Sequence, residues 1–293
     1  MRQGVRYDER ESGEDVMARI DLHVHSTLSD GGDTIDQVLE AAHKRGVKML
    51  SFVDHDMTLT YHVAKRKPAA RDITLVPGIE LSAYDFKRDR KVHVLGYDYN
   101  LDGSQMQQLT VPLLERRHQH SLWQVEQIRQ YGFDIDVEQV EAQLLPGQTV
   151  YKQHIMAALT DAHYATDEYR SLYRVLFKGD GPAAGDIEYM DVHDAVRAVK
   201  ADGGMAVIAH PGQLDSYDLI EELVELGIDG IEQYHPDHTE DDVRRVGELC
   251  DSYGLVTTGG SDYHGDFGVP VEIGMDADLL THRPFDEVPF KKC

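Results

Sequence analysis

The stretch Ile20-Asp21-Leu22-His23-Val24-His25-Ser26-Thr27-Leu28-Ser29-Asp30 decides how the rest of this sequence is interpreted. Apolar and polar residues alternate from Ile20 to His25, which is the period of a strand with one apolar face. His23 and His25 therefore project from the same face, close enough to hold one cation between two imidazoles. Asp30 ends the turn that follows. We predict a cation site here, with further ligands supplied by the rest of the chain.

Length and composition describe an ordinary globular protein. The 293 residues, 41% of them hydrophobic, suffice for one large α/β core with an inserted subdomain. The formal charge is -24, and such a surface repels phosphate backbones and anionic membranes. We therefore expect neither long nucleic acids nor membranes as partners. A small anionic substrate stays open if bound metal reverses the charge locally.

Other features bear on compartment and processing. Cys250 and Cys293 are far apart and offer no disulfide framework. The sequence contains no apolar run as long as a membrane span and no secretory signal. Residues 1–17 are polar and aperiodic, so we interpret them as a leader. We expect a cytoplasmic location, and the oligomeric state is left open.

From Ile20 onward, short apolar runs alternate mostly with helical patterns, which favours parallel strands in a barrel or a doubly wound sheet. Residues 101–186 differ, because they are rich in Gln and Glu and mostly helical in pattern. We predict a barrel over 18–100 and 187–293, interrupted by a helical insertion over 101–186. The seven predicted strands are Ile20–His25, Val47–Val53, Ile73–Leu81, Lys91–Tyr99, Ala206–Ala209, Gly230–Tyr234 and Leu255–Gly259.

Histidines and carboxylates gather at the ends of these strands, where the chemistry of such barrels is built. Singly, each has an ordinary structural explanation, such as a hydrogen-bonded core histidine or a turn carboxylate. Burying all of them without partners would cost several kcal/mol each, on the order of 2–7 for a polar group. Two or three divalent ions with a bridging carboxylate would resolve that cost. The predicted ligands are His23, His25, Asp30, His55, Glu80, His93, His210, Asp262 and His264.

The sequence resembles the PHP-domain phosphoesterases (polymerase and histidinol phosphatase superfamily). The matching motifs are His23-Val24-His25, Asp54-His55-Asp56, Gly78-Ile79-Glu80, His93-Val94-Leu95-Gly96, Ala209-His210-Pro211 and Gly260-Ser261-Asp262-Tyr263-His264.

The resemblance implies a distorted (β/α)7 barrel, of the α/β class, with a trinuclear site. It places His23, His25, Glu80 and Asp262 on a first ion. Glu80 would bridge to a second ion with His93 and His210. Asp30, His55 and His264 would hold a third ion. Some relatives have His at the position of Asp30, and the branch with Asp resembles the nucleotide and small-metabolite phosphatases.

The expected chemistry is attack on phosphorus by a hydroxide that bridges two of the ions, which are Mn, Fe or Zn. His235 or His238 would donate a proton to the leaving group or contact the substrate. The alternative for both is an exposed loop histidine. In the insertion, a second phosphate would be clamped by Arg116, Arg117, Lys152, His154 and Lys178, for which a solvated helix face is the alternative.

We expect a metal-dependent phosphoesterase that hydrolyses a small phosphorylated metabolite, with a nucleoside monophosphate or 3′,5′-bisphosphate as the first candidate. The alternatives are a cyclic phosphodiesterase acting on a sugar cyclic phosphate and a histidinol-phosphate phosphatase. A non-enzymatic alternative is a metal-binding regulatory PHP module. The predicted motifs are complete, which disfavours this last reading.

Overall fold

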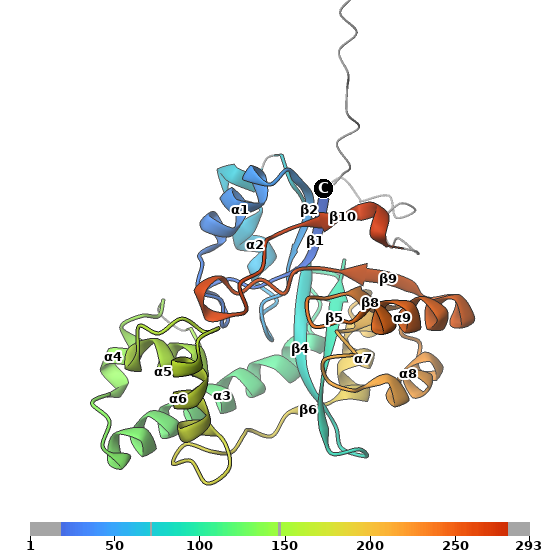
Figure 1. Ribbon diagram of the computed structural model, residues 1–293. Coiled ribbons are helices and arrows are strands. Elements are labelled where there is room, and N and C mark those ends of the chain that lie inside the picture. Colours follow the sequence, from blue (N-terminus) through green and yellow to red (C-terminus); the bar gives the residue numbers. More distant parts are fainter. Residues whose placement is uncertain (1–18, 71, 146–147, 281–293) are drawn as a thin grey trace, which may run out of the picture.

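The computed structural model describes residues 19–70, 72–145 and 148–280, shown in colour in Figure 1. The predicted leader and Cys293 lie outside these residues. Strands and helices occur together along the described chain, and many of them alternate, so the predicted α/β class is confirmed. No described helix has both the length and the apolar character needed to cross a membrane.

The strands form two sheets. The four-stranded sheet has the order β10-β1-β2-β3, and the six-stranded sheet has the order β6-β4-β5-β7-β8-β9. Isolated bridges link the sheets at Val24–Tyr263 and His55–Glu80. The strands are β1 (Arg19–Val24), β2 (Val47–Phe52), β3 (Thr74–Leu75), β4 (Gly78–Asp85), β5 (Arg90–Tyr97), β6 (Met190–Asp191), β7 (Met205–Ile208), β8 (Gly230–Tyr234), β9 (Val256–Gly259) and β10 (Met275–Asp276).

One pair of strands departs from the predicted parallel pattern. β4 and β5 form an antiparallel hairpin, and β5 also runs antiparallel to β7. The connection over 86–89 includes Asp89 at φ 55°, and it is too short for the crossover that parallel pairing requires. The predicted strand Ile73–Leu81 is also divided, between β3 and β4. The alternation of strands and helices in the sequence did not reveal this hairpin.

A core shared by both sheets fills the space between them. Ile20 and Leu22 of β1 pack with Leu95 and Tyr97 of β5 and with Val207 of β7. The Tyr97 hydroxyl donates to the Leu22 carbonyl oxygen at 2.8 Å, so its polar end is satisfied inside this core. The strand ends above this core are thereby held in fixed positions.

Helices cover the sheets on their outer sides. α7–α9 pack on the six-stranded sheet and α1 on the four-stranded sheet, whereas α3–α6 gather to one side in Figure 1. The helices are α1 (Ile35–Lys44), α2 (Thr60–Ala64), α3 (Gln105–Tyr131), α4 (Val137–Glu141), α5 (Lys152–Leu159), α6 (Asp167–Phe177), α7 (Val192–Ala201), α8 (Ile220–Leu226) and α9 (Glu240–Tyr253).

Helices α3–α6 have a core of their own. Val125 and Ile128 of α3 pack against Ile155 of α5 and against Leu176 and Phe177 of α6. The second half of α3 therefore buries its apolar side against α5 and α6, whereas Met106 and Leu113 in its first half pack with the core of the six-stranded sheet. The boundaries 101–186 for a separate insertion stay a prediction.

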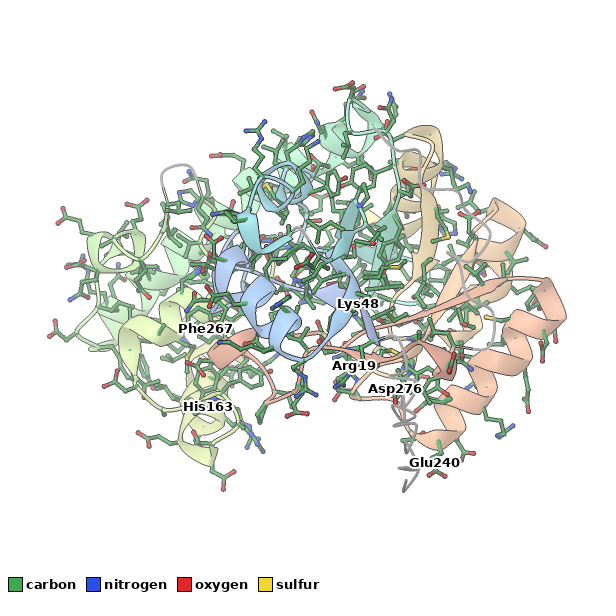
Figure 2. All side chains as sticks on the ribbon, turned by 90° about the horizontal axis from the view of Figure 1, so that it is seen from above. Arg19, Lys48, His163, Glu240, Phe267 and Asp276 are labelled. Atoms are coloured by element: carbon green, nitrogen blue, oxygen red, sulfur yellow. The ribbon has the colours of Figure 1, made fainter. Side chains whose placement is uncertain are left out.

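Asp21 of β1 ties distant parts of the chain together. Its buried carboxylate accepts hydrogen bonds from the Ser261 amide at 3.0 Å, the Ser261 hydroxyl at 2.6 Å and the Gly274 amide at 2.7 Å. Nearby, β1 pairs with β10 through Arg19 and Asp276, both labelled in Figure 2. The carboxylate thus fixes the start of the site loop after β9.

We predict that Asp21→Ala lowers the free energy of unfolding by about 2–4 kcal/mol, because it leaves several buried donors unpaired. Urea unfolding followed by circular dichroism measures the change. Asp276→Ala removes an exposed carboxylate from β10 and serves as the control, with an expected change within about 0.5 kcal/mol. Equal effects of the two substitutions would contradict this role of Asp21.

Candidate metal centre

The predicted ligands converge at one end of the strands. His23 lies in β1, Glu80 in β4 and His93 in β5, whereas the other ligands lie on loops that follow strands. Gly260 allows the loop after β9 to approach β1, because a Cβ there would lie 2.4 Å from His23 Cβ. Residues from both sheets therefore share one site.

Glu80 lies at the middle of this site. It is 1% exposed, and both carboxylate oxygens face imidazoles. Five ring nitrogens surround it: His23 Nε2 at 3.2 Å, His25 Nε2 at 3.1 Å and His55 Nδ1 at 3.5 Å from Oε2, and His93 Nδ1 at 2.8 Å and His210 Nε2 at 3.0 Å from Oε1. A carboxylate placed in this way can bridge two cations.

Asp262 completes the group on the Oε2 side of Glu80. Its Oδ1 lies 3.3 Å from both His23 Nε2 and His25 Nε2. Asp262 has φ 48°, a conformation that non-glycine residues adopt rarely and that turns its carboxylate toward the two rings. His23, His25, Glu80 and Asp262 each offer one ligand atom within 4.8 Å of the others.

Asp30 organises a second group. It lies 3.3 Å from His264 Nε2, 3.7 Å from His25 Nδ1 and 3.9 Å from His55 Nε2. His25 thus faces Glu80 with one nitrogen and Asp30 with the other. The four residues satisfy the same 4.8 Å criterion.

A third group differs in one member from the expected set. His55, Glu80 and His93 offer ligand atoms within 4.8 Å of one another, where the resemblance implies His93 and His210 beside Glu80. His210 nevertheless reaches Glu80 Oε1, as described above. His55 is therefore close to two of the groups.

Charge is distributed unevenly in the absence of a cation. Burial opposes protonation of His25, but Asp262 and Glu80 outweigh it and raise its pKa to about 10. Burial lowers the pKa of His55 to about 3 despite Glu80 and Asp30. Although burial raises the pKa of the Glu80 carboxyl, the adjacent imidazoles hold it well below its usual range. The carboxylates are ionised and require positive charge next to them.

Ring nitrogens in the site fit a metal centre. His25 Nδ1 and Nε2, His93 Nδ1 and His210 Nδ1 are buried and form no hydrogen bond with the described residues, although the nitrogens of His25 and His93 face the Glu80 or Asp30 carboxylates. Neutral imidazoles and ionised carboxylates are the donor set that Zn²⁺, Mn²⁺ and Fe²⁺ accept. The residues present therefore fit bound divalent metal ions.

Three contacts join the helical part to this centre. Gln153 of α5 donates to Asp30 Oδ2 at 2.9 Å. The Tyr151 hydroxyl donates to the His55 carbonyl oxygen at 3.1 Å. Arg117 of α3 donates to Asp56 Oδ2 at 3.0 Å and to Ser82 Oγ at 2.9 Å. These hydrogen bonds hold the helical part next to the metal centre.

A basic pocket of about 220 Å³ opens beside the Asp30, His55 and His93 side chains. Lys91, Arg117, His120 and Lys152 also line it. The other residues along its wall include Ser82, Ser121, Gln124, Tyr151, Gln153, Tyr173, Asp186 and Tyr189.

One ammonium group and two further nitrogens in this pocket have no hydrogen-bond partner among the described residues. The Lys152 ammonium has no hydrogen bond or ion pair with the residues that the structure describes, and burial lowers its pKa to about 8. Arg117 Nε and His120 Nε2 are buried without partners within the same described ranges. Lys91, by contrast, is paired with Asp186. The pocket can therefore accept an anion.

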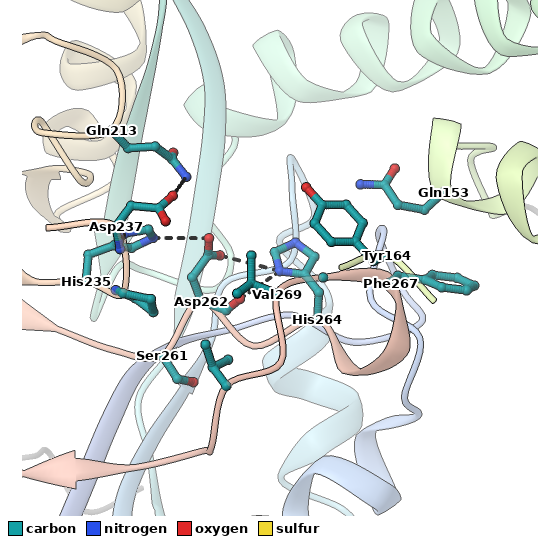
Figure 3. A pocket seen from close by; sticks show the side chains of 13 residues that line it. Gln153, Tyr164, Gln213, His235, Asp237, Ser261, Asp262, His264, Phe267 and Val269 are labelled. Atoms are coloured by element: carbon teal, nitrogen blue, oxygen red, sulfur yellow. Dashed lines mark hydrogen bonds and ion pairs between the residues drawn. The ribbon is translucent and has the colours of Figure 1, made fainter. Parts of the chain in front are cut away.

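A second, smaller pocket is lined by Asp262 and His264 (Figure 3). Its volume is about 120 Å³, and Tyr164 and Gln153 form part of its wall. Asp237, held by Gln213 at 2.7 Å, gives it a negative side. A second phosphate is disfavoured here by that carboxylate.

The two histidines after β8 differ in their surroundings. His238 Nδ1 donates to the Gln233 carbonyl oxygen at 2.9 Å, and its Nε2 accepts from the Gly212 amide at 3.1 Å, so both nitrogens are engaged by backbone. His235 lines the smaller pocket with Nε2 3.1 Å from Asp262 Oδ2. Only His235 of the pair faces the centre.

The remaining predicted clamp residues lie apart from the basic pocket. Arg116 donates outward to the Glu188 carbonyl oxygen at 3.1 Å. His154 is buried and its Nδ1 accepts from the Tyr151 amide at 3.0 Å, at the start of α5. Lys178 lies over the Tyr173 ring, 5.8 Å from its centroid. Among the predicted clamp residues, Arg117 and Lys152 line the pocket.

Several residues of the site escaped the sequence analysis. Glu232 is fully buried in β8 and contacts His23, and Lys91 and His120 line the basic pocket. The charged Glu232 within the otherwise uncharged strand Gly230–Tyr234 was an available signal, because a lone carboxylate in a buried strand needs a partner. Lys91 and His120 carry no such signal.

We predict that Mn²⁺ stabilises the chelator-treated protein, by about 2.7 kcal/mol at a concentration of 100 times Kd. Glu80→Gln should remove most of this gain, since it replaces the shared carboxylate with an amide. The exposed Glu221→Gln is the control. Thermal unfolding with and without Mn²⁺, Fe²⁺ or Zn²⁺ tests this, and an equal gain in Glu80→Gln would contradict it.

Comparison with known proteins agrees with this centre. Residues 21–201 match the PHP domain family. The chain is 51% identical over 255 residues to the phosphoribosyl 1,2-cyclic phosphate 1,2-diphosphodiesterase of Eggerthella lenta, covering 87% of this chain and 97% of that protein. It is 29% identical over 276 residues to the 3′,5′-nucleoside bisphosphate phosphatase of Chromobacterium violaceum, covering 90% and 93%.

The fold also has a near match among solved structures. A Bifidobacterium adolescentis protein superposes with a TM-score of 0.77 at 26% identity, covering 89% of this chain and 93% of that protein. The matched residues contain His23 of β1, His25 directly after it, Glu80 of β4 and His93 of β5. The chain therefore belongs to the PHP domain family, as its motifs predict.

Proposed function

We propose that this protein is a metal-dependent phosphoesterase that opens a cyclic phosphodiester on a phosphorylated ribose. The observation that carries the proposal is the basic pocket beside the Glu80 centre, because this pocket could serve as a binding site for a second phosphate. The extended similarity to the Eggerthella lenta enzyme supports a substrate of that class. This revises the order of candidates, in which a nucleoside phosphate came first.

The metal centre would hold the reacting phosphate. His23, His25, Glu80 and Asp262 would hold one divalent ion, and the groups around Asp30 and on the Oε1 side of Glu80 would hold others. When bound, these ions supply Lewis-acid polarisation of phosphoryl oxygens and lower the pKa of water. The protein's own contribution is to fix the ligands, since Gln153 and Tyr151 hold Asp30 and the His55 backbone.

The second phosphate would occupy the basic pocket. Lys152 supplies positive charge, Lys91 lies beside it paired with Asp186, and Arg117 Nε is available to donate a hydrogen bond. Hydrogen bonds to charged groups contribute about 1.5–3 kcal/mol each, so such a phosphate-binding pocket would favour substrates that carry two phosphates. The sugar would lie between the basic pocket and the metal centre. The strongly acidic chain would thus offer an anion a local binding site here.

We retain His235 as the candidate proton donor for the leaving oxygen. It lines the pocket next to Asp262 and His264, and its Nδ1 accepts from the Asp237 amide at 3.1 Å. The ring proton then resides on Nε2, which faces the centre. His238 lacks a free nitrogen and is better explained as a structural residue.

A 3′,5′-nucleoside bisphosphate is the second candidate. It also carries two phosphates, and the Chromobacterium violaceum relative is named for it. A single reacting phosphate with no second anion fits less well, because it leaves the basic pocket without a ligand. The number and identity of the ions, two or three of Mn, Fe or Zn, and a cytoplasmic location stay predictions.

The function is tested by a substrate panel with Mn²⁺ present. It contains ribose 1,2-cyclic phosphate with and without a 5-phosphate, adenosine 3′,5′-bisphosphate, AMP, histidinol phosphate and a 5′-phosphorylated RNA. We expect the highest kcat/KM for the cyclic phosphate with the 5-phosphate, and a loss of about 100-fold without it, which corresponds to about 2.7 kcal/mol. A preference for the compound without the 5-phosphate, or no turnover, would refute the proposal.

We predict that Lys152→Ala raises KM for the two-phosphate substrate at least tenfold and changes KM little for the cyclic phosphate that lacks the 5-phosphate. The reason is that the substitution removes the Lys152 ammonium from the proposed phosphate-binding pocket. Lys48→Ala, an exposed position of β2 labelled in Figure 2, is the matched control. Steady-state kinetics with both substrates measure this difference. An equal change in KM for the two substrates would argue against phosphate binding in the basic pocket.

The low pKa of Lys152 predicts a pH dependence. Burial lowers this pKa to about 8, so the ammonium is charged below pH 8 and loses its proton above it. KM for the two-phosphate substrate should therefore rise as the pH passes 8. Lys152→Arg should flatten this rise, since a guanidinium stays charged. An unchanged KM profile in that variant would show that another group titrates.

A further inference from the structure

Glu232 is a buried carboxylate whose two oxygens serve two different parts of the metal centre. It lies in β8 with no exposed surface. Its Oε1 is 2.9 Å from His23 Nδ1, and its Oε2 accepts a hydrogen bond from the His210 amide at 2.9 Å. His23 and His210 in turn contact different oxygens of Glu80.

The first contact determines which nitrogen of His23 carries a proton. An ionised carboxylate is only an acceptor, so the hydrogen between Glu232 Oε1 and His23 must reside on Nδ1. His23 Nε2 is then left to face Glu80 Oε2 at 3.2 Å and Asp262 Oδ1 at 3.3 Å. A metal ligand of this kind needs its other nitrogen fixed in the same manner.

The second contact holds an unusual backbone. His210 has φ 23°, in the left-handed range that non-glycine residues seldom occupy. The hydrogen bond from its amide to Glu232 keeps the residue in this conformation, which places its Nε2 at 3.0 Å from Glu80 Oε1. Glu232 therefore contacts a histidine on each side of the Glu80 carboxylate.

We propose that Glu232 is a positioning residue that selects the metal-binding tautomer of His23 and fixes the backbone of His210. The inference rests on the proposed metal-dependent function. A carboxylate retained only for folding would satisfy the same two donors but would not govern metal binding. These two roles differ in a measurable way.

Glu232→Gln separates them, because the amide has the same size and only one acceptor oxygen. If that oxygen keeps the His210 amide, the NH₂ group meets His23 Nδ1 and moves the ring proton to Nε2, which removes the lone pair that binds metal. If the oxygen turns to His23, the His210 amide loses its acceptor. Either orientation impairs one side of the centre.

The variant and the wild type are compared by elemental analysis, metal titration and long-range ¹H–¹⁵N NMR of the Zn²⁺-loaded proteins. We expect wild-type His23 to be protonated at Nδ1 and bound through Nε2. In Glu232→Gln we expect a 10–100-fold loss of affinity for at least one ion. Glu225→Gln, at an exposed position of α8, is the matched control and should behave as wild type.

Wild-type affinity and an unchanged His23 tautomer in Glu232→Gln would overturn the proposal. Should the variant fail to fold, the wild-type spectrum still decides, since His23 bound through Nδ1 or left unbound contradicts the inference. Failure of the proposed function is recognised separately. In that case the wild type would bind metal through His23 Nε2 but hydrolyse none of the phosphoesters.

Discussion

The structure depends on the placement of one ionised carboxylate, Glu80, out of contact with water and among five imidazoles. A charge in such a position is tolerated only when opposite charge and hydrogen bonds surround it. The surrounding rings come from strand ends of both sheets, so the two sheets must meet at this point. The shared core below and the bridge between His55 and Glu80 keep them there.

Electrostatics explains how an acidic protein can act on phosphate esters. Most of its surface repels anions, and the positive charge that a substrate needs is concentrated at a metal centre and one adjoining pocket. The pocket is formed partly by residues of the helical part, such as Lys152 and His120, which belongs to α3. The barrel-like part would thus perform the chemistry, and the helical part would select among phosphorylated substrates.

Much of this arrangement could be predicted from sequence. The alternation of short apolar runs with helical patterns predicted the α/β class, and the histidine and carboxylate motifs named the residues that the structure gathers around Glu80 and Asp30. The antiparallel hairpin of β4 and β5 was not recognised, because a buried strand has the same apolar pattern in either direction.

The substrate side of the site was harder to predict, because it depends on contacts between distant segments. Arg116 and Arg117 are neighbours in sequence, but only Arg117 turns inward to Asp56. Lys91 and Glu232 acquire their roles through partners far along the chain. No local pattern distinguishes such residues from ordinary charged or buried ones.

We propose that Glu80 bridges at least two metal ions, and anomalous diffraction from crystals grown with Mn²⁺ would locate these ions. The account predicts anomalous peaks on both sides of the Glu80 carboxylate, one shared with His23, His25 and Asp262 and another with His93 and His210. Each peak should lie within coordination distance of its ligand atoms. A single ion that leaves Glu80 uncoordinated, or no ion at this end of the strands, would contradict the account.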